Sequence, residues 1–101
     1  MAPRVLITGS SRGLGRATAL HFAEHGWDVV VHYVSSESAA KEVAEAVQAL
    51  GRSALLVKAD MSEPEDIQAM LDYVAQEWGS LRAIVANAAS GGFRPVVQAK
   101  T

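Results

Sequence analysis

The sequence predicts an α/β fold, a doubly wound parallel sheet covered by helices, and two patterns predict it. Four short apolar runs are rich in Val, Leu and Ile and do not alternate with polar residues, as in strands that are buried on both faces. Three segments with the period of a helix separate these runs. The resulting β-α-β-α-β-α-β alternation implies right-handed crossovers and a sheet order of 3-2-1-4. The predicted strands are Val5–Ile7, Val29–Tyr33, Ala54–Val57 and Ala83–Ala86.

The predicted helices carry small and apolar residues on one stripe, over residues 15–26, 40–50 and 67–78. Gly26 and Gly51 follow the first two stripes, where a residue with positive φ ends a helix. Ser62 and Glu65 match the Ser-x-x-Glu pattern of a capping box ahead of the third stripe. These predicted ends agree with the periodicity and support three helices between four strands.

Composition limits the classes of function that this chain can serve. Its 101 residues are enough for one small domain, which we expect to span residues 1–101. The chain has 9 Lys and Arg against 11 Asp and Glu, spread along its length, so no basic stripe is available for nucleic acid. Its apolar runs are too short for a membrane span, and no secretory signal is visible at the N-terminus. Because Cys is absent, disulfides and thiolate chemistry are excluded. Together these observations lead us to expect a soluble, cytoplasmic domain.

A glycine-rich turn joins the first predicted strand to the first predicted helix. A turn in this position suits a pyrophosphate, because free backbone N–H groups and the helix dipole both favour an anion. We interpret Gly9 as permitting the tight turn, Gly13 as letting the backbone approach phosphates, and Gly15 as allowing close packing of helix and strand. The alternative is a plain turn that needs flexible residues, and the strand–turn–helix context favours binding. The candidate binding residues here are Gly9, Ser10, Ser11, Arg12, Gly13, Leu14 and Gly15.

Three motifs in order resemble those of the short-chain dehydrogenase/reductase family. The spacing Thr-Gly-x-x-x-Gly-x-Gly from Thr8 to Gly15 resembles the cofactor motif of that family. Asp60-Met61, after the third strand, resembles the family's Asp that hydrogen-bonds adenine. Ala86-Asn87-Ala88-Ala89 resembles its Asn-Asn-Ala-Gly element, with Ala in place of the first Asn and of the Gly. The resemblance implies a Rossmann fold and adds Asp60, Met61, Asn87, Ala88 and Ala89 to the candidate cofactor-binding residues.

The end of the second predicted strand favours NADP(H) over NAD(H). NAD-selective sites place a carboxylate there, to accept a hydrogen bond from the ribose 2′-OH. The corresponding residue is Tyr33, and neither it nor Ser35 nor Ser36 is acidic. Arg12 in the glycine turn can donate charge-assisted hydrogen bonds to a 2′-phosphate, to which Ser35 and Ser36 can add hydroxyls. The alternative for Arg12 is a solvated loop charge. Ser35 or Ser36 is also expected to cap the second helix.

The resemblance implies a reductase that transfers hydride from NADPH to a carbonyl or an enoyl thioester, of the 3-oxoacyl or enoyl reductase type. In the family the proton donor is a Tyr, and a Lys four residues later lowers its pKa. This pair has no counterpart here, because neither Tyr33 nor Tyr73 is followed by a Lys at that spacing. We therefore predict no catalytic residue within the chain, and a domain that stops short of the catalytic half. The expected partners are a small-molecule or acyl-thioester substrate and, for a full-length protein, further copies of the same chain. The alternatives are a nucleotide-binding module without catalysis, or a partner protein that completes a sheet through an exposed edge of the fourth strand.

Other residues that could carry chemistry have simpler explanations. His21 and His25 are four residues apart on a predicted helix, but no third ligand accompanies them, so we predict no metal site. His32 lies in a predicted buried strand and is expected to be a hydrogen-bonded core residue.

Overall fold

A computed structural model describes residues 2–87 and the backbone of 96–99. Five strands form one sheet in the order β3-β2-β1-β4-β5. The first four, β1 (Arg4–Ile7), β2 (Asp28–Tyr33), β3 (Ala54–Lys58) and β4 (Ala83–Ala86), are mutually parallel. The doubly wound parallel arrangement and its 3-2-1-4 order are therefore as the sequence predicts.

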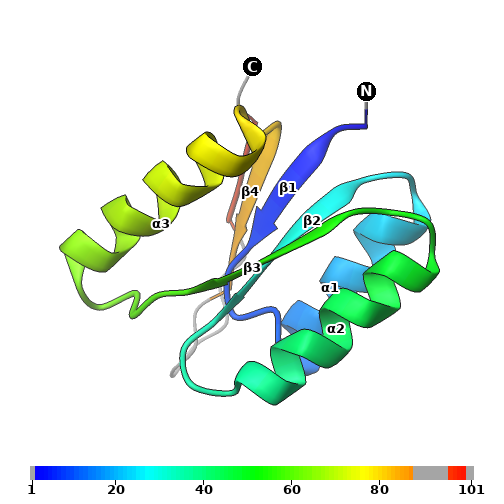
Figure 1. Cartoon of the computed structure of the whole chain (residues 1–101), viewed down its shortest axis with the longest axis horizontal. Helices are drawn as coiled ribbons and strands as arrows, with labels where there is room; N and C mark the ends of the chain where they lie inside the picture. Colours follow the sequence, from blue (N-terminus) through cyan, green and yellow to red (C-terminus); the bar gives the residue numbers. More distant parts are fainter. Residues whose placement is uncertain (1, 88–95, 100–101) are drawn as a thin grey trace.

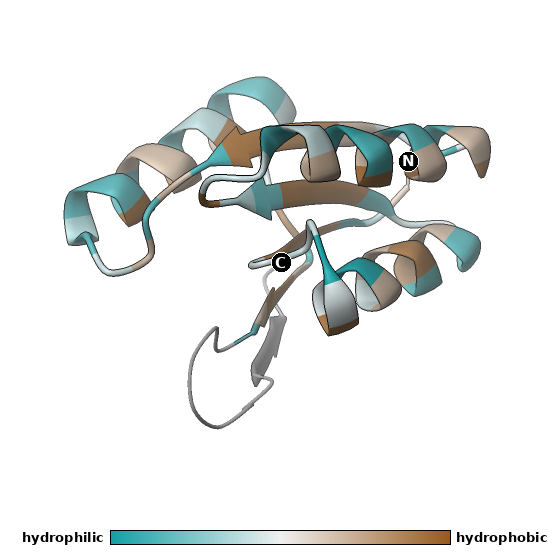
Figure 2. Ribbon diagram, turned by 90° about the horizontal axis from the view of Figure 1, so that it is seen from below, coloured by the Kyte–Doolittle hydropathy of each residue, from teal (hydrophilic) through white to brown (hydrophobic). Residues whose placement is uncertain are grey.

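Three helices cover the two faces of the sheet (Figure 1). Helices α1 (Gly13–Glu24) and α2 (Glu37–Ala49) pack on one face, where Val5, Val29 and Val43 are fully buried. Helix α3 (Pro64–Trp78) packs on the other face, against Leu6 and Val30. The strands are hydrophobic along most of their length, whereas each helix alternates between hydrophilic and hydrophobic turns (Figure 2). Continuous apolar strands thus supply both core layers, as expected for a sheet that is covered on both sides.

Helices α1 and α2 end in the same way. Gly26 and Gly51 have φ angles of 90° and 84°. The N–H of Trp27 donates to the carbonyl of Phe22, and the N–H of Arg52 donates to that of Val47. These are the bonds of a Schellman motif, which requires a left-handed residue between the helix and the next strand. The predicted glycine ends of both helices are confirmed.

Two local predictions are wrong. Helix α3 begins at Pro64 with Glu63 as its N-cap, so Ser62 lies one residue too early for a capping box with Glu65. The fixed φ of proline suits the first helical position and sets this start. The fourth strand is also not an open edge, because β5 (Val96–Ala99) pairs with β4 in antiparallel fashion. Unpaired N–H and C=O groups along an apolar strand favour such pairing, and a sheet-completing role through this edge loses its basis. Among the described residues, no helix is both long and apolar enough to cross a membrane.

Candidate functional site

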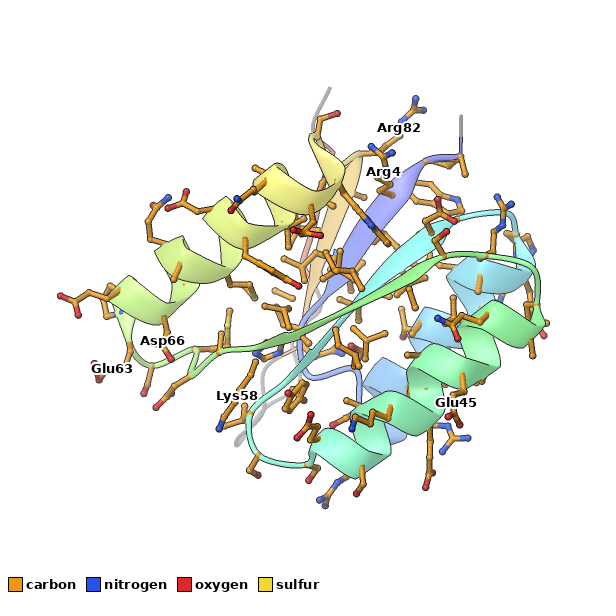
Figure 3. All side chains as sticks on the ribbon, viewed as in Figure 1. Arg4, Glu45, Lys58, Glu63, Asp66 and Arg82 are labelled. Carbon is orange, nitrogen blue, oxygen red and sulfur yellow. The ribbon has the colours of Figure 1, made fainter. Side chains whose placement is uncertain are left out.

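The candidate residues meet at one edge of the sheet, where the parallel strands end. The chain moves from β1 to β2 and β3 in one direction and then returns to β4 on the other side of β1. In sheets of this kind ligands bind outside the carboxyl ends of the strands, at the point where the order reverses. Lys58 and the start of α3, marked by Glu63, lie toward this edge, whereas Arg4 and Arg82 lie at the opposite one (Figure 3).

The glycine turn packs tightly against both β1 and β4. Gly9 and Gly13 have φ angles of 63° and 56°, in the left-handed region that favours glycine. A Cβ on Gly15 would lie 2.1 Å from the carbonyl oxygen of Gly9 and 2.8 Å from Nδ2 of Asn87. The start of α1 therefore touches the turn that precedes it, and no other residue type fits at Gly15 without movement of the backbone.

Asn87 joins the ends of β1 and β4. Its backbone N–H donates to Oγ1 of Thr8 at 2.9 Å, and its Nδ2 donates to the carbonyl of Thr8 at 3.0 Å. Its Oδ1 is buried and has no hydrogen-bond partner among the described residues. An amide oxygen accepts hydrogen bonds, so this atom can receive one from a donor.

The end of β2 carries hydroxyls and no carboxylate. Tyr33 is half-buried, Ser35 is exposed and Ser36 is the N-cap of α2. The side chain of Ser36 makes no capping hydrogen bond, and its Oγ instead accepts one from the guanidinium of Arg12. The structure thus brings together the arginine of the glycine turn and the predicted serine, which are 24 residues apart in the chain.

The end of β3 is organised by Asp60. Its Oδ1 accepts hydrogen bonds from the hydroxyl and the backbone N–H of Ser62, at 2.7 and 3.0 Å. These bonds, the hydroxyl first, hold the pKa of the Asp60 carboxyl below its usual value, so the group stays ionised at neutral pH. The backbone N–H of Asp60 donates to Oδ2 of Asp66, which ties this turn to the first turn of α3. The arrangement presents an ionised carboxylate at the surface.

Large apolar side chains are exposed beside these polar groups. Leu14, Val34 and Met61 follow or adjoin three different strand ends and are 55%, 50% and 37% exposed. Apolar surface next to a helix N-terminus, an arginine and a carboxylate suits a ligand that has a flat ring and an anionic part. A nucleotide has this combination.

The remaining predictions concern the two alanines after Asn87 and the three histidines. Ala88 and Ala89 lie outside the described residues. Within residues 2–87 no group of three potential metal ligands occurs, and the rings of His21 and His25 lie side by side, with centroids 4.4 Å apart and planes tilted by 44°. His32 is 1% exposed and hydrogen-bonded through its ring, as a core histidine should be.

Sequence reasoning missed three residues of this edge. Thr8 was part of the motif but was not expected to hold Asn87 through both its hydroxyl and its carbonyl. Lys58 pairs with Tyr33 across β2 and β3 and so brings a second cation to this edge; its signal was a basic residue at the end of an apolar run. Val34 is an exposed apolar residue directly after β2, and nothing in the sequence distinguished it from core valines.

Comparison with known proteins decides the family. A sequence model described as short chain dehydrogenase matches residues 3–101. The chain belongs to the short-chain dehydrogenase family. Among curated members, 3-oxoacyl-[acyl-carrier-protein] reductase FabG of Staphylococcus aureus is 38% identical over 88 residues, which are 87% of this chain and 36% of the relative. L-rhamnose 1-dehydrogenase (NAD(P)(+)) of a Sphingomonas species is 37% identical over 84 residues, 83% of this chain and 33% of the relative.

Solved structures of short-chain dehydrogenases share the fold. Acetoin dehydrogenase from Enterobacter cloacae superimposes with a TM-score of 0.85 at 33% identity, over 91% of this chain and 36% of that one. The reductase LugOII, which catalyses keto-reduction in lugdunomycin biosynthesis, gives a TM-score of 0.78 at 36% identity, over 87% and 38%. The chain spans about a third of the length of the curated relatives it matches.

Proposed function

We propose that this chain holds the adenosine and pyrophosphate half of NADP(H) in a short-chain reductase that transfers hydride from NADPH to a carbonyl or an enoyl thioester. The contact between Arg12 and Ser36, beside a β2 end without a carboxylate, carries the choice of cofactor. A 2′-phosphate at this place would receive a charge-assisted hydrogen bond from the guanidinium and a further bond from a hydroxyl. Lys58 adds a second positive charge next to Tyr33.

The pyrophosphate is assigned to the start of α1. The first N–H groups of a helix have no partner within it, and the helix dipole favours an anion there. Helix α1 begins at Gly13, so the N–H groups of Gly13, Leu14 and Gly15 are the donors in position. Gly9 and Ser10 are different, because their N–H groups already donate to His32. They shape the turn, and Ser11 and Arg12 lead into the donors.

The adenine and ribose are assigned to the neighbouring strand ends. Asp60 is exposed and ionised, and its Oδ2 is the oxygen that remains to accept from the adenine amino group, with Met61 as an apolar wall. On the other side of the glycine turn, Asn87 offers its Oδ1, which has no hydrogen-bond partner among residues 2–87. Ala88 and Ala89, which lie outside the described residues, are proposed to bind along the ribose, as the resemblance to the family implies.

The substrate class rests on the relatives. The curated relatives include 3-oxoacyl-[acyl-carrier-protein] reductases, and a solved relative carries out keto-reduction. Reduction of a carbonyl is therefore the first proposal for this protein, and reduction of an enoyl thioester the second. A cytoplasmic location and assembly into a homo-oligomer stay predictions.

Replacement of Arg12 tests the choice of cofactor. Arg12→Ala should raise the dissociation constant of NADPH and leave that of NADH nearly unchanged. A hydrogen bond to a charged group contributes about 1.5–3 kcal/mol, and allowing for the exposure of Arg12 the loss is about ten- to a hundredfold. Arg16→Ala is the matched control, because Arg16 is an exposed arginine in the first turn of α1, four residues after Arg12. If Arg12→Ala weakens both cofactors equally, the arginine holds the pyrophosphate or the loop, and the case for NADP(H) is lost.

The converse substitution adds the missing acid. Tyr33→Asp should shift preference toward NADH, because the new carboxylate accepts from a 2′-OH and repels a 2′-phosphate. Fluorescence titration with both cofactors measures the ratio of dissociation constants. An unchanged ratio would place the 2′-position of the ribose away from the end of β2.

A further inference from the structure

His32 is a polar residue in a strand whose other buried residues are all valines. It occupies the next-to-last position of β2 and is 1% exposed. Burial lowers the pKa of its ring, so the imidazole is neutral at physiological pH. A buried polar side chain is tolerated only when its hydrogen bonds are satisfied, so its partners show what it does.

Both ring nitrogens of His32 are hydrogen-bonded to backbone groups. The N–H of Gly9 donates to Nδ1 at 2.8 Å, and Nε2 lies 2.8 Å from the carbonyl oxygen of Ala59. An amide N–H only donates and a carbonyl only accepts, so Nδ1 is unprotonated and Nε2 carries the hydrogen. With one lone pair and one proton both engaged, the ring is not free to bind a metal or to transfer a proton.

The two partners belong to two different cofactor loops. Gly9 opens the glycine turn after β1, and Ala59 immediately precedes Asp60 after β3. We call the glycine turn from Gly9 to Gly15 the phosphate loop and the segment from Ala59 to Ser62 the adenine loop. The imidazole therefore bridges the phosphate loop and the adenine loop across the end of β2. No other side chain among the described residues makes hydrogen bonds to both loops.

We infer that His32 is a positioning residue that sets the distance between the phosphate loop and the adenine loop of the dinucleotide site. The inference rests on the function proposed above and adds a residue that touches neither phosphate nor adenine. A dinucleotide bound across both loops needs them at one separation, and a rigid ring with two fixed hydrogen bonds holds that separation before the ligand arrives.

The backbone of His32 has hydrogen bonds that do not involve its ring. The N–H of Ser10 donates to the carbonyl of His32 at 3.1 Å, and the N–H of His32 donates to Oγ of Ser10 at 2.9 Å. These bonds hold the glycine turn to β2 without the imidazole. A side-chain variant should therefore keep the fold and release only the Gly9 amide and the Ala59 carbonyl.

Three substitutions separate the two ring contacts. His32→Leu is apolar and removes both contacts, His32→Asn places an acceptor near the position of Nδ1, and His32→Gln places a donor near that of Nε2. We expect His32→Leu to weaken NADPH binding by about tenfold or more, because it leaves a buried amide and carbonyl unpaired. His32→Asn should recover most of the loss and His32→Gln a smaller part. His21→Leu, the same change at an exposed histidine of α1, is the control and should bind as the wild type does.

Nuclear magnetic resonance tests the bridge itself, without any cofactor. A scalar coupling through the hydrogen bond should connect the Gly9 amide nitrogen to Nδ1 of His32, and Nε2 should carry the proton. Absence of that coupling, or a proton on Nδ1, overturns the inference, as does equal NADPH affinity of the wild type, His32→Leu and His32→Asn. If the coupling is present and the wild type binds neither NADPH nor NADH, the bridge exists and the proposed function is what fails.

Discussion

Gly15 offers a substitution whose cost can be worked out from distances. A Cβ at this position would lie 2.1 Å from the Gly9 carbonyl oxygen, so a Gly15→Ala chain must move the turn by roughly 1 Å to reach ordinary contact. The turn resists that movement, because the N–H of Gly9 is bonded to His32 and Asn87 packs against the same site. The clash is with backbone, and no side chain can rotate away from it.

The magnitude is a balance of two terms. Overpacking of this kind costs about 1–3 kcal/mol, and a backbone clash belongs at the upper end. Alanine in a helix gains about 0.5–1 kcal/mol over glycine, because glycine loses more freedom on folding. The net expectation is a loss of about 2 kcal/mol in the free energy of unfolding, which for a domain of this size lowers Tm by roughly 10 °C.

Gly13→Ala is the matched control for this assay. Gly13 lies in the same turn with a φ of 56°, and a Cβ there would meet no atom within 4 Å. Its cost is conformational only, about 1 kcal/mol. Urea and thermal unfolding of both variants, followed by circular dichroism, separate the two effects. A Gly15→Ala chain as stable as Gly13→Ala, or more so, would show that the close approach of helix and turn is not real.

Two further predictions concern the adenine loop and pH. Asp60→Ala should weaken NADPH binding, measured by calorimetry, and leave the fold intact. Ser62→Ala removes only the hydroxyl that bonds to Asp60 and should bind NADPH nearly as the wild type does. Equal losses of affinity in both variants would assign the effect to the loop and not to the carboxylate. Burial, partly offset by the bond to the Ala59 carbonyl, lowers the pKa of His32 from 6.5, so the unfolded chain takes up this proton more readily than the folded one. The free energy of unfolding should not depend on this group above about pH 6.5 and should fall as the pH drops below that value. Urea titrations at several pH values should show this pH dependence in the wild type and not in His32→Asn. The same pH dependence in the wild type and in His32→Asn would contradict the argument.

The main features of the fold follow from patterns that are local in sequence. Apolar runs without alternation indicate buried strands, and Gly26 and Gly51 mark helix ends because few other residues tolerate a positive φ. The start of α3 was misjudged, since proline at the first helical position outweighed the Ser62 pattern. The antiparallel β5 was not predicted, because pairing between β4 and β5 depends on partners that the sequence pattern does not specify.

The candidate site was predicted as a set of residues but not as a network. The glycine spacing points to a nucleotide by residue type and position, whereas Asp60 was predicted only through the resemblance to the family. The contact of Arg12 with Ser36 and the hold of Thr8 on Asn87 join residues 24 and 79 positions apart, which only the fold brings together. His32 was expected to be a satisfied core histidine, and it is one. Its hydrogen-bond partners are backbone groups of the loops after β1 and β3, and only the fold brings these loops to its ring, so its positioning role emerges only from the structure.

Recognition of the 2′-phosphate is the central claim, and the adenosine half of the cofactor tests it most directly. Calorimetric titration with adenosine 2′,5′-bisphosphate and with adenosine 5′-monophosphate compares ligands that differ only in the 2′-phosphate, and it requires no nicotinamide site. We expect the bisphosphate to bind at least tenfold more tightly, with an advantage that shrinks when the salt concentration is raised and is largely lost in Arg12→Ala. Equal affinity for the two nucleotides, or an advantage that Arg12→Ala leaves unchanged, would contradict the account.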